Sequence, residues 1–306
     1  AQTWNTFGSG MNGEVDALLE DDVNGFLYAG GMFTVAGGNA TANIAKWDGT
    51  AWAALGSGTN SVVNDMAIFN GELYAVGSFS SPGNHIAKWS GSAWTTVGGG
   101  TNSSAFALQV LNGALYVGGA FTMAGGVPAN RVAKWDGSSW TTLIDTTFYF
   151  SDANVMKIGA DGIIYFGGSF PNIFRGDFNP TCSGQVIYAN PDTSSTFDCH
   201  DLGENAEVNA LAVHPQNNTI NVGGSFSTNW GDINLTTFNG GSIDGVSGPV
   251  YDIDVDDLGN VYVTGDFTST LAYDGSIDQA APAGIASWNG SAWTSYPVVI
   301  DGDPWY

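Results

Sequence analysis

The chain has 306 residues and a formal net charge of −23, with 6 Lys and Arg against 29 Asp and Glu. So acidic a surface repels phosphate backbones and anionic membranes, which argues against a nucleic-acid-binding protein. Hydrophobic residues make up 43% of the chain, enough to fill a core, so composition excludes a disordered protein. The chain contains no apolar run of about 18 residues, as a membrane-spanning helix would need.

The first predicted element is a strand at Trp4–Gly10. Its letters, Trp-Asn-Thr-Phe-Gly-Ser-Gly, match the spacing of Trp52–Gly58, which is predicted to end the next repeat. A strand of this type should follow three others, so it is surplus to the repeats that come after it. The residues that carry the match are candidates for an assembly contact: Trp4, Phe7, Gly8 and Gly10.

A Gly-Gly-x-Phe pattern then recurs along the chain. The strict copies are Gly30–Phe33, Gly118–Phe121, Gly167–Phe170 and Gly223–Phe226, and the looser ones are Val76–Phe79 and Thr264–Phe267. The Phe residues follow one another at intervals of 46, 42, 49, 56 and 41 residues. A period of about 40–50 residues built from short strands is typical of a β-propeller with one four-stranded blade per repeat.

We therefore expect an all-β chain that forms a single β-propeller domain over residues 1–306. The strand count predicts six four-stranded blades, with seven as the alternative, and a surplus N-terminal strand within residues 1–10. That strand has three outcomes: it closes the ring by displacing Ala292–Tyr296, adds a fifth strand to its own sheet, or is donated to a neighbouring subunit. A head-to-tail donation of this kind generates filaments unless the rotation closes.

Each repeat divides into four strand signals. A first strand leads through an Asn-Gly or Asp-Gly turn into the Gly-Gly-x-Phe strand, as at Asn70-Gly71 and Asn24-Gly25. The glycines predict that an adjacent blade brings its backbone close to this strand. The third strand carries Lys before a Trp, as Lys46, Lys88 and Lys134 do, and these lysines are expected to pair with a neighbouring blade or to stay in solvent.

A second Trp opens the fourth strand, five residues after the first. In one interpretation these Trp residues pack between blades. In the alternative interpretation they stack on sugar rings, which would make the chain a multivalent lectin. The candidate stacking residues are Trp52, Trp94, Trp140 and Trp293. The pattern erodes in the fourth repeat, and in the fifth Phe238 takes the first Trp position.

The two cysteines, Cys182 and Cys199, both fall in the longest repeat. Paired, they would close a small loop and contribute about 3 kcal/mol. A disulfide fits an oxidising compartment, and the opening Ala1-Gln2-Thr3 resembles what signal-peptidase cleavage leaves behind. We therefore expect an extracellular or cell-surface protein, with two unrelated thiols as the alternative to a disulfide.

The third repeat resembles repeats of secreted bacterial cell-surface propeller proteins. The resemblance rests on residues 115–126, Leu-Tyr-Val-Gly-Gly-Ala-Phe-Thr-Met-Ala-Gly-Gly, and on residues 131–140, Arg-Val-Ala-Lys-Trp-Asp-Gly-Ser-Ser-Trp. It is also similar to the extracellular propeller of fungal cortical polarity markers. The resemblance implies an extracellular, usually non-enzymatic protein. It carries over no functional residues, because the shared positions are packing positions.

Catalytic patterns are missing from the sequence. It has no Gly-x-Ser-x-Gly nucleophile elbow and no His-Glu-x-x-His, so we expect a protein that is not an enzyme and needs no cofactor. The best metal candidates are Asp252, Asp254 and Asp256, whose oxygens would suit Ca²⁺, and the alternative, which we favour, is an acidic strand that runs into a solvated turn. Sequons for N-glycosylation occur at Asn39, Asn102, Asn217, Asn234 and Asn289.

The sequence thus predicts a structural or adhesive propeller that associates with itself through its terminal segments. The alternatives are a multivalent lectin and a surface module stabilised by Ca²⁺. The partners expected are copies of the chain itself, glycans or other surface proteins.

Overall fold

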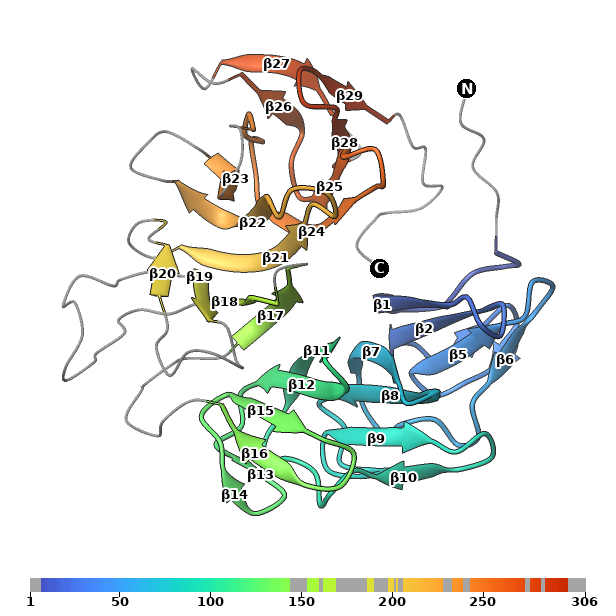
Figure 1. Ribbon diagram of the computed structural model, residues 1–306. Helices are drawn as coiled ribbons and strands as arrows, with labels where there is room; N and C mark the ends of the chain where they lie inside the picture. Colours follow the sequence, from blue (N-terminus) through green and yellow to red (C-terminus); the bar gives the residue numbers. More distant parts are fainter. Residues whose placement is uncertain are drawn as a thin grey trace. The chain divides into compact units, whose positions relative to one another are not determined.

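The computed structural model describes residues 7–143, 153–159, 162–168, 186–189, 198–200, 202, 206–227, 233–238, 243–272, 276–281 and 284–296. These residues form strands and turns without a helix, and therefore contain no helix that could cross a membrane. The chain groups into two compact units, residues 1–146 and residues 147–304. Each unit contains three of the larger sheets in Figure 1.

The first unit holds three antiparallel four-stranded sheets, and in each the strands follow one another in chain order. The first sheet contains β1 (Glu14–Asp21), β2 (Phe26–Met32), β5 (Ile44–Trp47) and β6 (Trp52–Ala54), the second β7 (Val63–Phe69), β8 (Glu72–Gly77), β9 (Ile86–Trp89) and β10 (Trp94–Thr96), and the third β11 (Ala105–Leu111), β12 (Ala114–Gly119), β15 (Val132–Trp135) and β16 (Trp140–Thr142). Two-stranded hairpins accompany the first and third sheets: β3 (Val35–Ala36) with β4 (Asn39–Ala40), and β13 (Met123–Ala124) with β14 (Val127–Pro128).

The second unit repeats this plan with one difference. The fourth sheet contains β17 (Ala153–Ile158), β18 (Ile164–Gly168), β19 (Val186–Ala189) and β20 (Asp198–His200), and the sixth contains β24 (Val250–Val255), β25 (Val261–Gly265), β28 (Ile285–Trp288) and β29 (Trp293–Ser295), with the hairpin β26 (Ser269–Leu271) and β27 (Ile277–Ala280). The fifth sheet has only three strands among the described residues: β21 (Glu207–Val213), β22 (Ile220–Ser227) and β23 (Ile233–Phe238).

A β-bulge lies at the same place in the first strand of every one of these six sheets. The register between the first and second strands shifts there by one residue, as between Val63 and Asp65 or between Val250 and Asp252. The residues skipped by the shift are Asp16, Asn64, Phe106, Asn154, Asn209 and Tyr251. A bulge bends its strand and increases the local twist, so the repeat carries a recurring bend that Gly-Gly-x-Phe alone does not reveal.

The paired glycines serve two different contacts. A Cβ on the first glycine would strike a side chain of the next sheet, as Gly30 would strike Val63 at 2.6 Å. A Cβ on the second would strike the carbonyl that precedes the bulge in the same sheet, as Gly31 would strike Glu14 and Gly77 would strike Val62. The prediction of a close approach between blades is thus correct for the first glycine, but the approaching group is a side chain rather than a backbone.

The turns differ in part from the prediction. Asn70 and Gly71 both adopt positive φ, 52° and 76°, as a two-residue hairpin turn requires, and so do Asn112 and Gly113. The first sheet instead has a longer turn between Asp21 and Phe26, in which the Asp21 carboxylate accepts bonds from Asn24. The two-residue turn predicted at Asn24-Gly25 is therefore wrong.

Candidate functional site

The N-terminal segment Phe7–Gly10 lies against the first sheet. The Phe7 carbonyl accepts a hydrogen bond of 3.0 Å from Nε1 of Trp52, and the Phe7 ring meets Trp47 edge-on at 5.7 Å between centroids. The Gly10 carbonyl accepts a bond of 2.7 Å from the Gly37 amide, between β3 and β4. The segment is thus held by the outer Trp pair and by the hairpin of this sheet.

Two internal segments contact the sheet that follows them in the chain in the same way. Trp94 Nε1 donates to the Leu55 carbonyl at 2.8 Å, and Trp140 Nε1 donates to the Gly98 carbonyl at 3.1 Å. The segments Leu55–Gly58 and Val97–Gly100 directly follow β6 and β10, and each carries the chain to the next sheet. Phe7–Gly10 therefore occupies the place of a linker that has just left the outer strand of a sheet.

This geometry corrects the predicted strand at Trp4–Gly10. Residues Phe7–Gly10 form a turn, because Gly8 and Gly10 adopt φ of 65° and 73°, outside the strand region. Trp4 lies outside the described residues, so the predicted strand character of Trp4–Thr6 stays a prediction. Phe7 also differs from its counterparts: it is 51% exposed, whereas Leu55 and Val97 are 3% and 2% exposed.

The Trp pairs pack inside the sheets. Each pair sits directly opposite across the third and fourth strands, with ring centroids 5.1–5.5 Å apart. Trp52, Trp140 and Trp293 are 3%, 7% and 2% exposed, so their faces are not open to a sugar ring. The sugar-stacking prediction is therefore not supported at these three positions; Trp94 alone of the four candidates is half-buried.

The acidic run Asp252–Asp256 is a strand that leads into a turn. Asp256 accepts bonds from the amides of Leu258 and Asn260 and from the Asn260 side chain, and these bonds lower its pKa. Among the described residues, no three His, Cys, Asp or Glu side chains form a group that could hold a metal ion. The Ca²⁺ site predicted at Asp252, Asp254 and Asp256 therefore finds no support among the described residues and stays a prediction.

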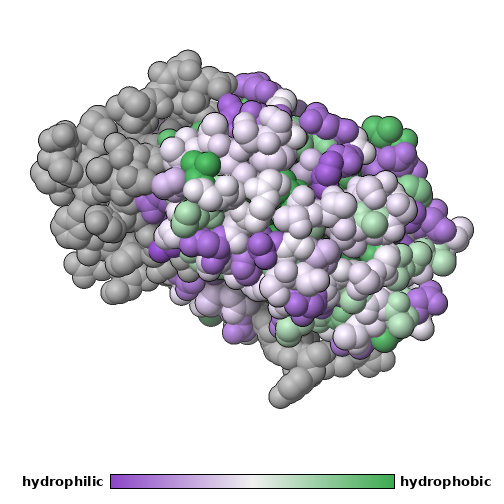
Figure 2. All heavy atoms as spheres, turned by 90° about the horizontal axis from the view of Figure 1, so that it is seen from below, coloured by the Kyte–Doolittle hydropathy of each residue, from purple (hydrophilic) through white to green (hydrophobic). Residues whose placement is uncertain are grey.

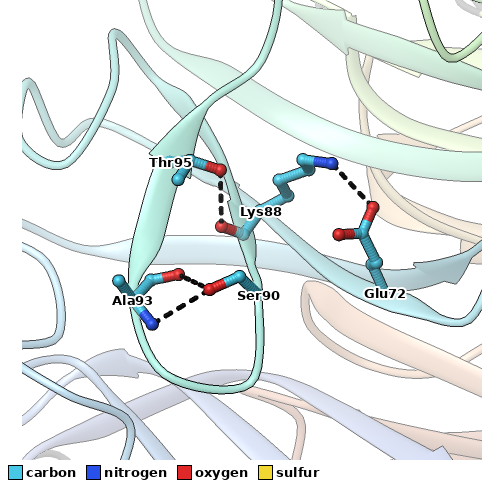
Figure 3. Close-up of polar contacts among 5 residues, drawn as sticks. All are labelled: Glu72, Lys88, Ser90, Ala93 and Thr95. Carbon is cyan, nitrogen blue, oxygen red and sulfur yellow. Dashed lines mark hydrogen bonds and ion pairs between the residues drawn. The ribbon is translucent and has the colours of Figure 1, made fainter.

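The lysines interact within their own sheets, which differs from the predicted pairing with a neighbouring blade. Lys88 forms a salt bridge of 2.7 Å with Glu72 on the adjacent strand (Figure 3). Lys46 lies 4.0 Å above the ring of Phe26, and Lys134 lies 5.5 Å from the centroid of Tyr116. The bond to Glu72 raises the pKa of Lys88, so this side chain stays charged.

The sequons fall into different environments. Asn234 is buried and donates to the Val246 carbonyl, which is incompatible with a glycan at that position in this fold. Asn39 and Asn102 are exposed, but their amide nitrogens donate to Trp52 and Thr122. Asn217 and Asn289 use their oxygens to accept backbone amides. Cys182 lies outside the described residues and only the backbone of Cys199 is described, so their predicted pairing stays a prediction.

The exposed surface offers no large apolar area on the face shown in Figure 2, where hydrophobic residues form small separate groups among hydrophilic ones. The contact built by Phe7–Gly10 with Trp47, Trp52 and Gly37 is the arrangement on which the functional argument below rests.

The fold is that of a β-propeller. At 12% identity, the chain is similar to the WD40 β-propeller domain of Doa1, with a TM-score of 0.57 over 82% of this chain and 76% of that one. It is also similar to the computationally designed protein Ika8, with 15% identity, a TM-score of 0.55 and coverage of 92% and 82%. No protein-family model matches the chain, and no curated protein matches it. These likenesses define the fold and no more.

Proposed function

We propose that this chain is an extracellular, non-enzymatic structural propeller of six blades that associates with itself head to tail through residues 1–10. The observation that carries the proposal is the docking of Phe7–Gly10 on the first sheet as a linker. Linkers of this kind follow an outer strand, and Trp4-Asn5-Thr6 has the letters of such a strand, like Trp94-Thr95-Thr96.

The sixth sheet supports the proposal because it already has an outer strand of its own. β29 pairs with β28, with Trp293 directly opposite Trp288. A strand formed by Trp4–Thr6 is thus not required to complete that sheet, and the predicted displacement of Ala292–Tyr296 is not what the structure shows. The strand is left to pair with another edge, and an edge on a second copy of the chain leads to head-to-tail assembly.

The half-exposed ring of Phe7 supports a contact at this end of the chain. Its buried counterparts Leu55 and Val97 are each covered at a junction between successive sheets. A second copy that pairs with Trp4–Thr6 would cover Phe7 in the same way and would remove apolar area from water at about 25 cal/mol per Å².

The test compares two truncations by light scattering and electron microscopy. Deletion of residues 1–6 should leave a folded monomer, because Phe7 still accepts the bond from Trp52. Deletion of residues 1–10 should also give a monomer, but one with a lower melting temperature, since it uncovers Trp47 and Trp52. A chain lacking residues 1–6 that still forms the assemblies of the full chain would contradict the proposal.

A further inference from the structure

The outer strand of the second sheet differs from those of the first, third and sixth sheets in what covers its edge. In the first, third and sixth sheets a hairpin contacts the outer strand: β3–β4 contacts β6, β13–β14 contacts β16, and β26–β27 contacts β29. In two of these the hairpin also binds the edge, because Asn39 Nδ2 donates to the Trp52 carbonyl and Gln279 Nε2 donates to the Trp293 carbonyl, both at 2.9 Å.

The second sheet has a short turn, Ser80–Gly83, where those sheets have a hairpin. This turn reaches the end of β10, since a Cβ on Gly83 would lie 3.4 Å from the Cα of Thr96. Among the described residues, β9 is the only strand that pairs with β10. Trp94 remains half-buried, whereas Trp52, Trp140 and Trp293 are buried. Among the described residues, the edge of β10 thus lacks a hairpin like those that contact β6, β16 and β29.

The register shows which backbone groups face outward from β10. In an antiparallel ladder, hydrogen-bonded and non-hydrogen-bonded pairs alternate. The Ser90 amide donates to the Ala93 carbonyl in the turn. The next pair, Trp89 and Trp94, is therefore not hydrogen-bonded, and the following pair, Lys88 and Thr95, is hydrogen-bonded. Trp94 and Thr96 therefore direct their N–H and C=O groups away from β9. The Thr95 hydroxyl donates to the Lys88 carbonyl within the sheet (Figure 3), so it does not compete for a partner at the edge.

We infer that this edge accepts residues Trp4–Thr6 of a second copy of the chain as a fifth strand. The inference rests on the proposed function and names its acceptor surface. An exposed edge with outward N–H and C=O groups pairs readily with an extended segment. The segment has the strand letters Trp-x-Thr of β10 itself, and a cross-strand Trp pair like Trp89–Trp94 becomes available between Trp4 and Trp94.

Charge favours this occupant over an arbitrary peptide. Residues 1–6 contain no acidic side chain, whereas the chain as a whole carries −23. An uncharged segment can approach a strongly acidic surface of a second copy without the repulsion that most other parts of the chain would meet. The edge strand itself, Trp94-Thr95-Thr96, is uncharged as well.

The test removes one outward donor. Thr96→Pro deletes an N–H that points away from β9, so it spares the ladder within the sheet. Ala54→Pro makes the same change at the equivalent position of β6, whose edge is covered by β3–β4, and serves as the matched control. Both variants should fold with circular dichroism spectra like that of the parent chain.

The full chain is assayed for assembly by light scattering, and a chain lacking residues 1–6 is assayed for binding of a synthetic peptide of residues 1–7. Thr96→Pro should weaken peptide binding and raise the concentration needed for assembly about tenfold, the effect of about 1.4 kcal/mol, while Ala54→Pro changes neither. Unchanged binding in Thr96→Pro, together with loss of assembly on deletion of residues 1–6, would overturn the acceptor edge and leave the proposed function standing. Assembly that persists after the deletion would overturn both.

Discussion

Gly30 in the first sheet and Val63 in the second are fitted to each other: a Cβ on Gly30 would lie 2.6 Å from Cγ1 of Val63. Between the second and third sheets the large and small side chains change places: Val76 occupies the position of Gly30, and Ala105 occupies the position of Val63. Both are fully buried in one core cluster. The strict copy at Gly30 and the looser copy at Val76 are thus two solutions to one packing problem, because a close-packed interior conserves volume at each junction.

Gly30→Ala should lower the free energy of unfolding by about 1–3 kcal/mol, because the added methyl group overpacks the junction with Val63. Val63→Ala in the same chain should recover part of that loss, since it restores the total volume. Urea denaturation of the two single variants and the double variant measures the coupling. Strictly additive effects would contradict the size exchange.

His85→Asn should stabilise the chain. His85 adopts φ of 64° and its Nδ1 is buried with no hydrogen-bond partner, whereas Asn43 at the equivalent position, with φ of 63°, donates to the Thr59 carbonyl at 2.8 Å. Asparagine tolerates this backbone conformation and would supply the missing donor, worth about 0.5–1.5 kcal/mol. The check is the melting temperature at neutral pH.

The same substitution should change the pH dependence. Burial lowers the pKa of His85 below its ordinary value of 6.5, so the neutral form is favoured in the folded state. The folded state therefore carries no penalty above about pH 6.5 and loses stability as the pH falls from 6.5 toward the lowered pKa of His85. Melting curves between pH 7 and pH 5 should therefore fall more steeply for the parent chain than for His85→Asn; parallel curves would count against the assignment.

Asp48→Asn should make the first sheet's outer turn insensitive to acid. The Asp48 carboxylate accepts bonds from the amides of Thr50 and Ala51 and from the Thr50 hydroxyl, which lower its pKa to about 2. Its stabilising effect is present above the ordinary pKa of 3.8 and is lost as the pH falls toward about 2. Asn289 accepts the same pattern of bonds without a charge, so Asn at position 48 should keep the turn.

The expected result for Asp48→Asn is a shallower fall of the melting temperature between pH 5 and pH 2 than in the parent chain. Asn289→Asp is the reciprocal control and should introduce an acid dependence at the equivalent turn. If neither substitution alters the melting temperature between pH 5 and pH 2, hydrogen bonding to these side chains does not control stability in that pH range.

Trp52→Phe should release the N-terminal segment. The change keeps the aromatic packing on Trp47 but removes the N–H that binds the Phe7 carbonyl, at a cost of about 0.5–1.5 kcal/mol. Hydrogen exchange at residues 8–12 should become faster. Trp94→Phe is the matched control: it should accelerate exchange near Leu55 and leave residues 8–12 unaffected.

The repeat period and the Trp pairs were sufficient to predict a β-propeller, because the period follows the succession of sheets along the chain and the Trp pairs join the third and fourth strands in four of them. The bulge was not predicted, although Asn occupies three of its six positions, Asn64, Asn154 and Asn209. Asp16, Phe106 and Tyr251 interrupt that pattern, and backbone geometry rather than one side-chain type sets the position. The role of the second glycine was missed for the same reason: the carbonyl that crowds it comes from that bulged strand.

The candidate site was predicted only in part. The match between Trp4–Gly10 and Trp52–Gly58 correctly related Phe7 to Leu55, but letters alone did not separate the strand Trp52–Ala54 from the linker that begins at Leu55. The positive φ of the glycines is what separates the linker from the strand. The partner of each linker is an indole N–H on the following sheet, about 40 residues away in the chain.

Structure determination of assembled material by electron cryomicroscopy tests the central claim most directly. We predict that residues 4–6 of one chain form a strand paired with a sheet of another chain, while Phe7 of the donor remains bound to its own Trp52. Residues 4–6 paired with a sheet of their own chain, or material that is monomeric at every concentration examined, would contradict it.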